Sequence, residues 1–153
     1  MTKTNYAPDG YLGATPYLCC NDAPAAIEFY KKAFGAVELF RLTENGGRLG
    51  HAEIKIGDAV IMLSDEYPEA GVRSPKSLGG ASVSIHVYVE NVDKLADTAV
   101  AAGAKLLRPV ADAFYGDRNC AMEDPFGHRW MFATHKEDVS IDEMQKRYDA
   151  LTK

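Results

Sequence analysis

Residues Tyr115–His135, YGDRNCAMEDPFGHRWMFATH, contain the signals that decide the fold of this chain. The residue order predicts a strand, a turn and a second strand, at Arg118–Glu123, Asp124–Gly127 and His128–Thr134 respectively. Pro125 restricts φ to a value that suits a turn, and Gly127 can adopt a positive φ. The stretch is therefore predicted to form a β-hairpin.

The remainder of the chain contains short apolar or alternating runs that are typical of strands. Strands are expected at Ala14–Cys20, Val37–Thr43, Leu49–Ile56, Ala59–Ser64, Ser82–Val89 and Lys105–Val110. Two helices are expected, one capped by Asn21 or Asp22 and ended by Gly35, the other capped by Asn91 or Asp93 and ended by Gly103. The chain thus alternates a strand, a helix and three strands.

That order occurs twice, and the two copies are in register. The matching positions are Thr15 and His86, Asp22 and Asp93, Gly35-Ala36 and Gly103-Ala104, and Gly57 and Gly127. Several matches in the same order indicate a duplicated βαβββ module. The predicted fold class is α+β, with two modules forming an open, cupped mixed sheet and helices on the outside.

A single domain over residues 1–153 is expected. Its predicted parts are module one at about 12–65, a linker at 66–80, module two at 81–135 and a helical tail at 139–151. Ser140 and Glu143 form a capping-box pair at the start of that tail. Ile141, Tyr148 and Leu151 form part of an apolar stripe, so we expect the tail to pack on the body or on the second subunit of a homodimer.

Strand alternation assigns side chains to the two faces of the sheet. Since the helices must cover the apolar faces, Trp130 and Phe132 are expected beneath a helix, with His128 on the same side in a structural role. The opposite faces are expected to line the cup. They carry Thr15, His51, Glu53, Ser84, His86, Tyr88 and Met131.

Composition restricts the class of protein. A net charge of −5 and a pI near 5.3 give no basic surface, so nucleic acid is not an expected partner. No apolar run approaches membrane-spanning length, and the N-terminus lacks the apolar core of a signal peptide. The three cysteines match no zinc-site spacing, and Cys20 and Cys120 are expected to be buried and reduced. The expected location is the cytoplasm.

Four segments resemble one family. TPYLCCNDAPAAIEFYKKAFGA, HAEIKIGDAVIMLSDE, YVENVDKLADTAVAAGA and YGDRNCAMEDPFGHRWMFATHKEDVS are similar to the PhnB-like branch of the vicinal oxygen chelate superfamily, which includes glyoxalase I, bleomycin-resistance proteins and extradiol dioxygenases. The resemblance covers nearly the whole chain. It implies a protein of unestablished reaction that binds a small molecule in the cup.

The resemblance also implies where a metal would bind. The positions that hold ligands in the superfamily's metal enzymes correspond here to places near Thr15, Met62, His86 and Met131. Only His86 carries an imidazole, and Met131 stands where the family often has a glutamate. Thioethers are poor ligands for hard cations. The resemblance therefore implies His86 as the candidate metal ligand, and the expected cofactor is either a divalent metal (zinc, nickel, manganese or iron) or none.

Several side chains permit two interpretations. His86 could be a metal ligand or general base, or a pocket histidine held by a hydrogen bond. His51 and Glu53 could present two ligands, or a base with its orienting carboxylate, or an ordinary sheet face. Arg118 could bind a carboxylate or phosphate, or stiffen its loop through a salt bridge. Tyr88 and Tyr115, with Phe114, could form a pocket wall or core.

Two functional hypotheses follow. In the first, the protein binds a small, aromatic or anionic molecule without metal, through Tyr88, Tyr115 and Arg118. In the second, it is a divalent-metal-dependent lyase, isomerase or dioxygenase that uses His86 with His51 and Glu53. Met131 and Thr15 favour the first hypothesis, and the face that carries the two histidines and Glu53 favours the second.

Overall fold

The computed structural model describes residues 6–11 and 13–152, and the chain divides into two compact units between Gly80 and Ala81. The first unit contains, in chain order, β1 (Tyr17–Cys20), α1 (Ala23–Phe34), β2 (Val37–Thr43), β3 (Leu49–Ile56), β4 (Ala59–Asp65), the short 3-10 helix η1 (Pro68–Ala70) and α2 (Pro75–Leu78). The segment at 66–80, expected to be a linker, therefore contains two short helices.

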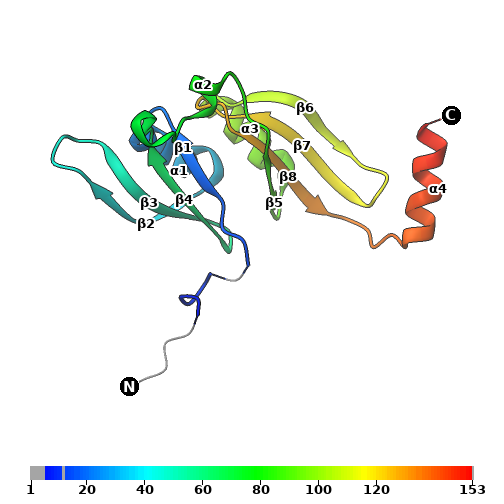
Figure 1. The fold of residues 1–153 in the computed structure, drawn as a ribbon. Helices are drawn as coiled ribbons and strands as arrows, with labels where there is room; N and C mark the ends of the chain where they lie inside the picture. The colour runs from blue at the N-terminus through cyan, green and yellow to red at the C-terminus, as the bar shows by residue number, and fades with distance from the viewer. Residues whose placement is uncertain (1–5, 12, 153) are drawn as a thin grey trace. The chain divides into compact units, whose positions relative to one another are not determined.

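The second unit has the same order of elements, followed by a terminal helix (Figure 1). It contains β5 (Ser84–Tyr88), α3 (Val92–Ala102), β6 (Lys105–Asp112), β7 (Asp117–Glu123), β8 (Arg129–His135) and α4 (Ile141–Leu151). No helix in residues 6–11 and 13–152 has the length and apolar character that crossing a membrane requires.

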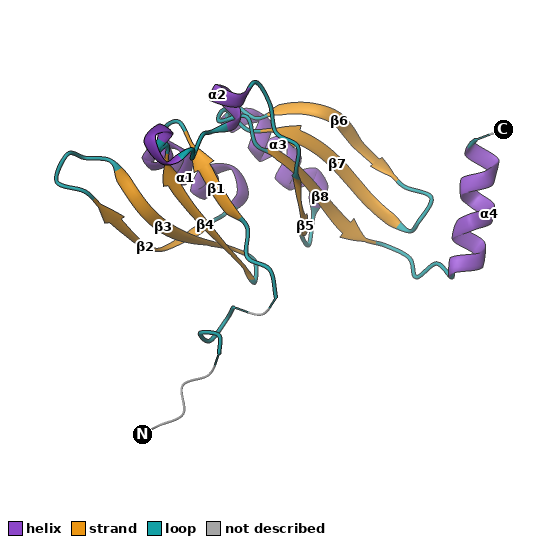
Figure 2. Ribbon diagram, in the orientation of Figure 1, coloured by secondary structure: helices purple, strands orange, loops and turns teal. Residues whose placement is uncertain are grey.

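Each unit has one four-stranded mixed sheet, and the two sheets have the same topology (Figure 2). The strand orders are β1-β4-β3-β2 and β5-β8-β7-β6. In each, the first strand pairs in parallel with the last, and the remaining neighbours are antiparallel. The prediction of an α+β fold built from duplicated βαβββ modules is confirmed.

The sequence-predicted caps determine where α1 and α3 begin and end. Of the alternatives open for each helix, Asp22 and Asn91 are the N-caps, and their side chains accept hydrogen bonds from Ala25 N at 3.0 Å and Lys94 N at 2.9 Å. Such bonds satisfy amide groups that the first helical turn leaves without intrahelical partners. Gly35 and Gly103 follow the helices with φ of 68° and 118°, a conformation that favours glycine.

Strand alternation separates the two faces of each sheet as expected. In the first unit, Ile54, Ile61 and Leu63 are fully buried on the α1 side. In the second, Trp130 and Phe132 are fully buried and their rings stack with centroids 5.9 Å apart. Burial of these apolar side chains supplies the main driving force for folding of each unit.

The β7–β8 turn is closed by the carboxylate of Asp124, which is only 2% exposed. One of its oxygens accepts hydrogen bonds from Phe126 N and His128 N, both at 2.9 Å, and the other accepts from Trp130 Nε1 at 2.8 Å. Gly127 has φ of 90°, which confirms the predicted turn chemistry. His128 is buried in the turn, as its expected structural role requires.

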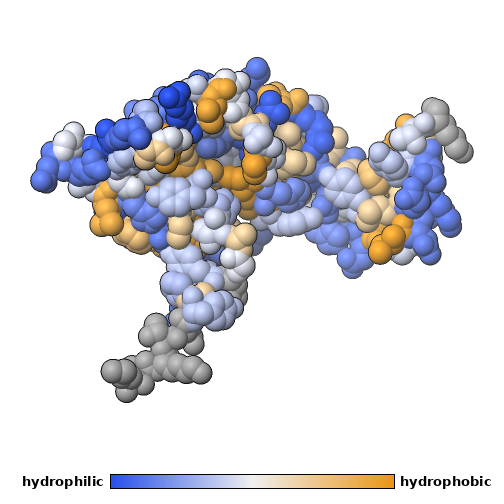
Figure 3. All heavy atoms as spheres, viewed as in Figure 1, coloured by the Kyte–Doolittle hydropathy of each residue, from blue (hydrophilic) through white to orange (hydrophobic). Residues whose placement is uncertain are grey.

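The terminal helix α4 has few contacts with the rest of its unit. Ser140 caps it by accepting a hydrogen bond from Glu143 N at 3.3 Å, as predicted. Arg147 bonds Glu137 and donates to Phe114 O at 3.2 Å. No residue of α4 is buried, and hydrophobic atoms are visible on its surface (Figure 3). The predicted apolar stripe therefore lies mostly exposed in the single chain.

Candidate functional site

On the sheet face of the first unit that lies opposite α1, His51 is held between two hydrogen-bond partners. Its Nδ1 lies 2.8 Å from the Tyr17 hydroxyl, and its Nε2 lies 3.1 Å from Glu53 Oε1. Glu53 is only 6% exposed, and its second oxygen accepts a hydrogen bond from the Tyr11 hydroxyl. In a neutral imidazole one nitrogen donates and the other accepts, so donation to Glu53 leaves Nδ1 to accept from Tyr17.

Aromatic rings surround this histidine. The Tyr17 ring centroid is 5.4 Å from the His51 ring, and that of Phe40 is 5.7 Å away. Tyr17 is 53% exposed, so its ring is available to a ligand while its hydroxyl is fixed. A buried carboxylate that orients an imidazole is an arrangement used to hold a histidine as a hydrogen-bond acceptor or base.

A second hydrogen-bonded chain lies on the corresponding face of the second unit. The Tyr88 hydroxyl donates to Asp117 Oδ2 at 2.8 Å, and the other oxygen of Asp117 lies 2.8 Å from His135 Nδ1. His135 Nε2 is 2.9 Å from Asp138. Asp117 is only 4% exposed, whereas Tyr88 is 59% exposed. The His86 ring lies beside Tyr88, with centroids 5.0 Å apart.

These contacts change the ionisation of all three members. Burial alone would raise the pKa of Asp117, but the hydrogen bonds from His135 and Tyr88 outweigh it, and the pKa lies below its ordinary value. The same carboxylate raises the pKa of Tyr88. Hydrogen bonds to Asp117 and Asp138 raise the pKa of His135. Asp117 is therefore charged at neutral pH, and protonation of His135 strengthens its contact with Asp117.

The His135 contact predicts a pH-dependent contribution to stability. Because the folded state raises the pKa of His135, the contribution is fully present below about pH 6.5, the ordinary histidine pKa, and is lost as the pH rises through the folded-state value. We expect His135→Gln to lower the melting temperature at about pH 5.5 and to have a smaller effect at about pH 9.

The comparison variant for that measurement is His86→Gln. His86 is exposed on the same face, makes no hydrogen bond to Asp117 and lowers the pKa of Asp117 through charge alone, as the weakest of its causes, so we expect a smaller pH-dependent effect. Melting curves of both variants and the parent protein are recorded across the same pH range. An effect of His135→Gln that is constant with pH, or that grows with rising pH, would contradict the assigned charge pairing.

On the same face of the second unit, hydrogen bonds of the Asn119 side chain connect β6 to β7. Asn119 donates through Nδ2 to the Tyr115 hydroxyl at 2.6 Å and accepts at Oδ1 from an Arg108 guanidinium nitrogen at 2.8 Å. Asn119 is 4% exposed, whereas Arg108 is exposed. A buried amide thus fixes both a phenol and a guanidinium at the surface of the sheet.

Strand register shows that the two units place these groups at equivalent positions. Met62 pairs with both Tyr17 and Glu53, and Ala133 pairs with both Tyr88 and Asn119. Tyr17 is therefore equivalent to Tyr88, and Glu53 to Asn119. His51 lies two residues before Glu53, and Asp117 lies two residues before Asn119, so His51 and Asp117 are equivalent as well. In both modules a tyrosine of the first strand bonds to a side chain of the third.

The sequence-predicted candidates are partly brought together. His51 and Glu53 contact each other, and His86 lies directly opposite Met131 in the β5–β8 register, on the face that also carries Tyr88. Thr15 is half-buried just before β1. Tyr115 reaches this face of the second unit through Asn119.

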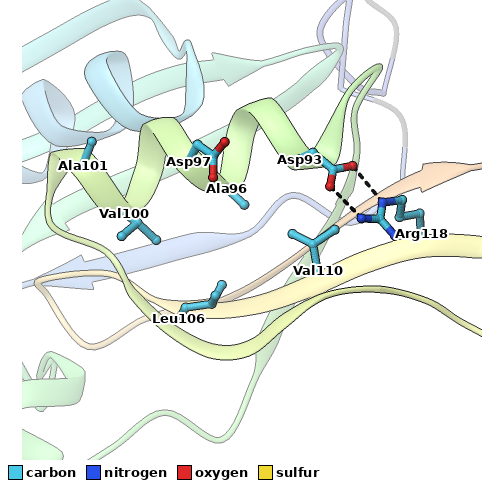
Figure 4. Close-up of a pocket in the computed structure, with 8 residues that line it drawn as sticks. All are labelled: Asp93, Ala96, Asp97, Val100, Ala101, Leu106, Val110 and Arg118. Atoms are coloured by element: carbon cyan, nitrogen blue, oxygen red, sulfur yellow. Dashed lines mark hydrogen bonds and ion pairs between the residues drawn. The ribbon is translucent and has the colours of Figure 1, made fainter.

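Arg118 is placed elsewhere. Its guanidinium bonds to Asp93 at 2.7 and 2.8 Å and to Asp112 at 3.1 Å, on the α3 side of the sheet. It borders a cavity of about 540 Å³ whose other lining residues are Asp93, Ala96, Asp97, Val100, Ala101, Leu106 and Val110 (Figure 4). The expected grouping with Tyr88 and Tyr115 is corrected: Arg118 shares strand parity with buried Cys120 and Met122, so it must face the helix.

Sequence reasoning missed Tyr17, Arg108, Asn119 and the role of Asp117 in holding Tyr88. One signal was present in the sequence for Tyr17, because it is separated from Tyr88 by the same interval that separates Thr15 from His86. No comparable signal marked Arg108, since a bulge shifts the β6–β7 register on either side of it. Side-chain parity along β6 therefore could not be counted from the sequence.

The donors do not form an evident metal centre. Within residues 6–11 and 13–152, no three His, Cys, Asp or Glu side chains are grouped in a way that could hold a metal ion. The family ligand positions supply one imidazole, a hydroxyl and two thioethers, which is an unsuitable set for a hard divalent ion. Both ring nitrogens of His51 are already engaged.

Cys20 and Cys120 are fully inaccessible, as predicted, and Cys19 is half-buried. Burial raises the pKa of the Cys120 thiol, and burial together with nearby Glu66 and Asp65 raises that of Cys19 to about 11. A raised thiol pKa lowers the thiolate fraction at neutral pH, and thiolate is the nucleophilic form. Neither cysteine has the environment of a nucleophile.

Comparison with known proteins gives one family and one fold. Residues 11–132 match the family model described as the Glyoxalase/Bleomycin resistance protein/Dioxygenase superfamily. The chain is 42% identical over 134 residues to an uncharacterized protein of Mycobacterium bovis, covering 86% of this chain and 88% of the relative.

Two solved structures are similar in fold. TioX from a Micromonospora species has a TM-score of 0.65 at 24% identity, with 84% of this chain and 100% of that chain covered. A glyoxalase-related enzyme from Fulvimarina pelagi has a TM-score of 0.61 at 23% identity, with 81% and 88% covered. At these identities the likeness concerns the fold alone.

Proposed function

This chain belongs to the Glyoxalase/Bleomycin resistance protein/Dioxygenase superfamily, and from that premise we propose that it binds a small molecule on the helix-free faces of its sheets. By the helix-free face we mean, in the first unit, the side that carries Tyr17, His51 and Glu53. In the second unit it is the side that carries His86, Tyr88, Arg108, Tyr115, Asn119 and Met131. The proposed contacts in the second unit are Tyr88 and Tyr115, with His86 and Met131 beside them.

One observation carries this proposal: on this face, buried polar side chains fix the hydroxyls of two tyrosines, of which Tyr88 is exposed and Tyr115 is half-buried. Asp117 holds Tyr88, and Asn119 holds Tyr115. Burying a carboxylate or an amide is unfavourable unless it is hydrogen-bonded, and an apolar side chain would serve the fold as well. Buried anchors beneath surface aromatics instead preorganise a recognition surface.

A spectroscopic experiment tests the location. In protein labelled with methyl-13C methionine, titration with benzyl alcohol is expected to shift the methyl signal of Met131, on the helix-free face. It should not shift that of Met122, which is fully buried on the α3 side. Tyr88→Ala should weaken the response of Met131 by about tenfold, because it removes an exposed aromatic contact.

The matched control is Tyr148→Ala, which removes an exposed tyrosine of α4 instead. It is expected to leave the titration unchanged. A response confined to Met122 or Met144, or an equal loss in both tyrosine variants, would count against the helix-free face as the binding surface.

The alternative is a metal-dependent lyase, isomerase or dioxygenase that uses His86 with His51 and Glu53. The pairing of His51 with a buried glutamate favours this alternative, whereas the donor set at the family ligand positions does not fit a hard divalent ion. We expect protein purified without chelator to contain no stoichiometric zinc, nickel, manganese or iron. Stoichiometric metal that is lost in His86→Ala would support the enzyme instead.

Three finer features belong to the same proposal. Membership of the PhnB-like branch is supported by the four segments quoted from the sequence, and a cytoplasmic location by the three free cysteines. A homodimer is supported by exposed apolar side chains on the edge strand β2 and on α4. These are Val37, Phe40, Leu42, Ile141, Tyr148 and Leu151.

A further inference from the structure

Within residues 6–11 and 13–152, Arg108 has no acidic partner, in contrast to four other arginines of the chain. Arg41, Arg48, Arg118 and Arg147 each form at least one salt bridge. Within the described residues, the guanidinium of Arg108 makes one hydrogen bond, which it donates to Asn119 Oδ1, a neutral acceptor. A guanidinium has five N–H donors, so most of those on Arg108 remain available to a ligand.

Arg108 also lies in one row with His86 and Met131, which stand beside the proposed tyrosine contacts. It pairs with Ala121 on β7, Ala121 pairs with Met131 on β8, and Met131 pairs with His86 on β5. Residues directly opposite each other in neighbouring strands share a face of the sheet. The four strands lie side by side in this order in Figure 1. The guanidinium and the imidazole thus stand on one surface, with small and flexible side chains between them.

The guanidinium of Arg108 is positioned by a network of side-chain hydrogen bonds. Asn119, at 4% exposure, bonds Arg108 on one side and the Tyr115 hydroxyl on the other. This bond restricts the rotamers of Arg108, which lowers the entropy lost when a ligand is bound. A surface arginine that served only solubility would need no buried amide beneath it.

The charges around Arg108 leave its positive charge uncompensated. In the adjacent row, Glu123 lies opposite Lys105 and Arg129, so two cations flank that one carboxylate. The other acidic group on this face, Asp117, is already bonded to Tyr88 and His135. None of Lys105, Arg108 and Arg129 forms a salt bridge within the described parts of the chain. The face therefore has an excess of positive charge despite the net charge of −5.

We propose that Arg108 binds the oxyanion of an aromatic small molecule, a carboxylate or a phosphonate, whose ring contacts Tyr88 and Tyr115. This proposal rests on the proposed function and specifies the class of ligand. The planar guanidinium presents parallel donors that match a carboxylate or phosphonate in bidentate fashion. Arg108 takes the role that the sequence alone assigned to Arg118, whose donors are occupied by Asp93 and Asp112.

Three probes of similar size test the inference: benzoate, phenylphosphonate and neutral benzyl alcohol. Dissociation constants are measured from the Met131 methyl signal in the full chain. Benzoate or phenylphosphonate is expected to bind roughly tenfold or more tightly than benzyl alcohol, the scale of one charge-assisted hydrogen-bonded pair. The tighter of the two anions shows whether planar or tetrahedral oxyanions are preferred.

Arg108→Met is expected to remove that tenfold preference and to leave benzyl alcohol within about twofold of its original dissociation constant. Arg108→Lys, which keeps the charge without the planar fork, should retain part of the preference. Arg118→Met is the matched control and should leave all three dissociation constants unchanged. The unchanged Met122 signal shows that each variant is folded.

The outcomes separate this inference from the proposed function. Equal binding of all three probes, with no effect of Arg108→Met, would overturn the role of Arg108 and leave the helix-free face as a binding surface. A loss of anion binding in Arg118→Met but not in Arg108→Met would overturn it too. If no probe moves Met131, both the inference and the proposed function fail.

Discussion

Replacing Asp124 with alanine is expected to lower the free energy of unfolding by about 3–5 kcal/mol. The substitution removes the acceptor of three hydrogen bonds, from Phe126 N, His128 N and the Trp130 indole. All three lie in a buried turn, where a donor without a partner retains the cost of desolvation. Urea denaturation followed by the fluorescence of Trp130, the chain's single tryptophan, measures the change.

Asp58 provides the matched control, because it lies in the tight turn between β3 and β4, the equivalent turn of the first unit. Its side chain is fully exposed and only reaches Lys55 at 3.6 Å. Asp58→Ala is expected to change stability by no more than about 0.5 kcal/mol. A loss below about 1 kcal/mol for Asp124→Ala would show that the carboxylate does not hold the hairpin together.

Asp65→Ala is expected to destabilise the first unit by about 2–4 kcal/mol. The carboxylate, at the end of β4, accepts from Ala23 N and Leu49 N, both at 2.7 Å. It therefore joins the start of α1 and the start of β3 to the centre of the sheet. A carboxylate at a helix N-terminus also interacts favourably with the helix dipole. Hydrogen exchange of the β3 amides measures the loss in this unit, which has no tryptophan.

The same Asp58→Ala variant serves as control, since it removes a carboxylate from the same unit without removing a buried hydrogen bond. Exchange of its β3 amides should match that of the parent protein. Equal exchange rates in Asp65→Ala and Asp58→Ala would mean that the two hydrogen bonds of Asp65 contribute nothing net to stability.

The fold could be predicted because its signals are local. Helix caps and turn glycines recur in the same order in both modules, and strand alternation separates the buried residues from the others. The bounds of β2 and β3 agree with the sequence expectation, and the other strands differ at their ends by a few residues. Local propensity and hydrophobic pattern point to the same structure throughout each module, which is typical of a foldable sequence.

The candidate site could be predicted only in part, because it depends on long-range pairing. His51 and Glu53 are two residues apart on one strand, so alternation sufficed to place them together. Tyr88 and Asp117 are 29 residues apart, and their contact follows from the β5–β8–β7 order, which sequence spacing does not provide. The predicted role of Arg118 did not take into account which face of β7 its side chain occupies. Arg108 could not be placed on a face from the sequence, because the β6–β7 register shifts on either side of it.

Duplication gives the two helix-free faces one framework with different chemistry. The first module has the imidazole of His51 where the second has the carboxylate of Asp117. Tyr17 therefore donates to a neutral imidazole nitrogen, and Tyr88 donates to a carboxylate oxygen. Glu53 and Asn119 occupy the other equivalent position, which makes one face more acidic and leaves the other able to hold a guanidinium. We therefore place the proposed anion recognition on the second module.

The most direct test is the 15N–1H signal of the Asn119 side-chain amide during titration with benzoate. This amide bonds Tyr115 and Arg108, the two groups that should contact the ring and the carboxylate of the probe. We predict a saturable shift of this signal in the parent protein and its loss in Arg108→Met. An unchanged Asn119 signal, while amides beside Asp93 and Val110 on the α3 side shift and saturate, would contradict the account.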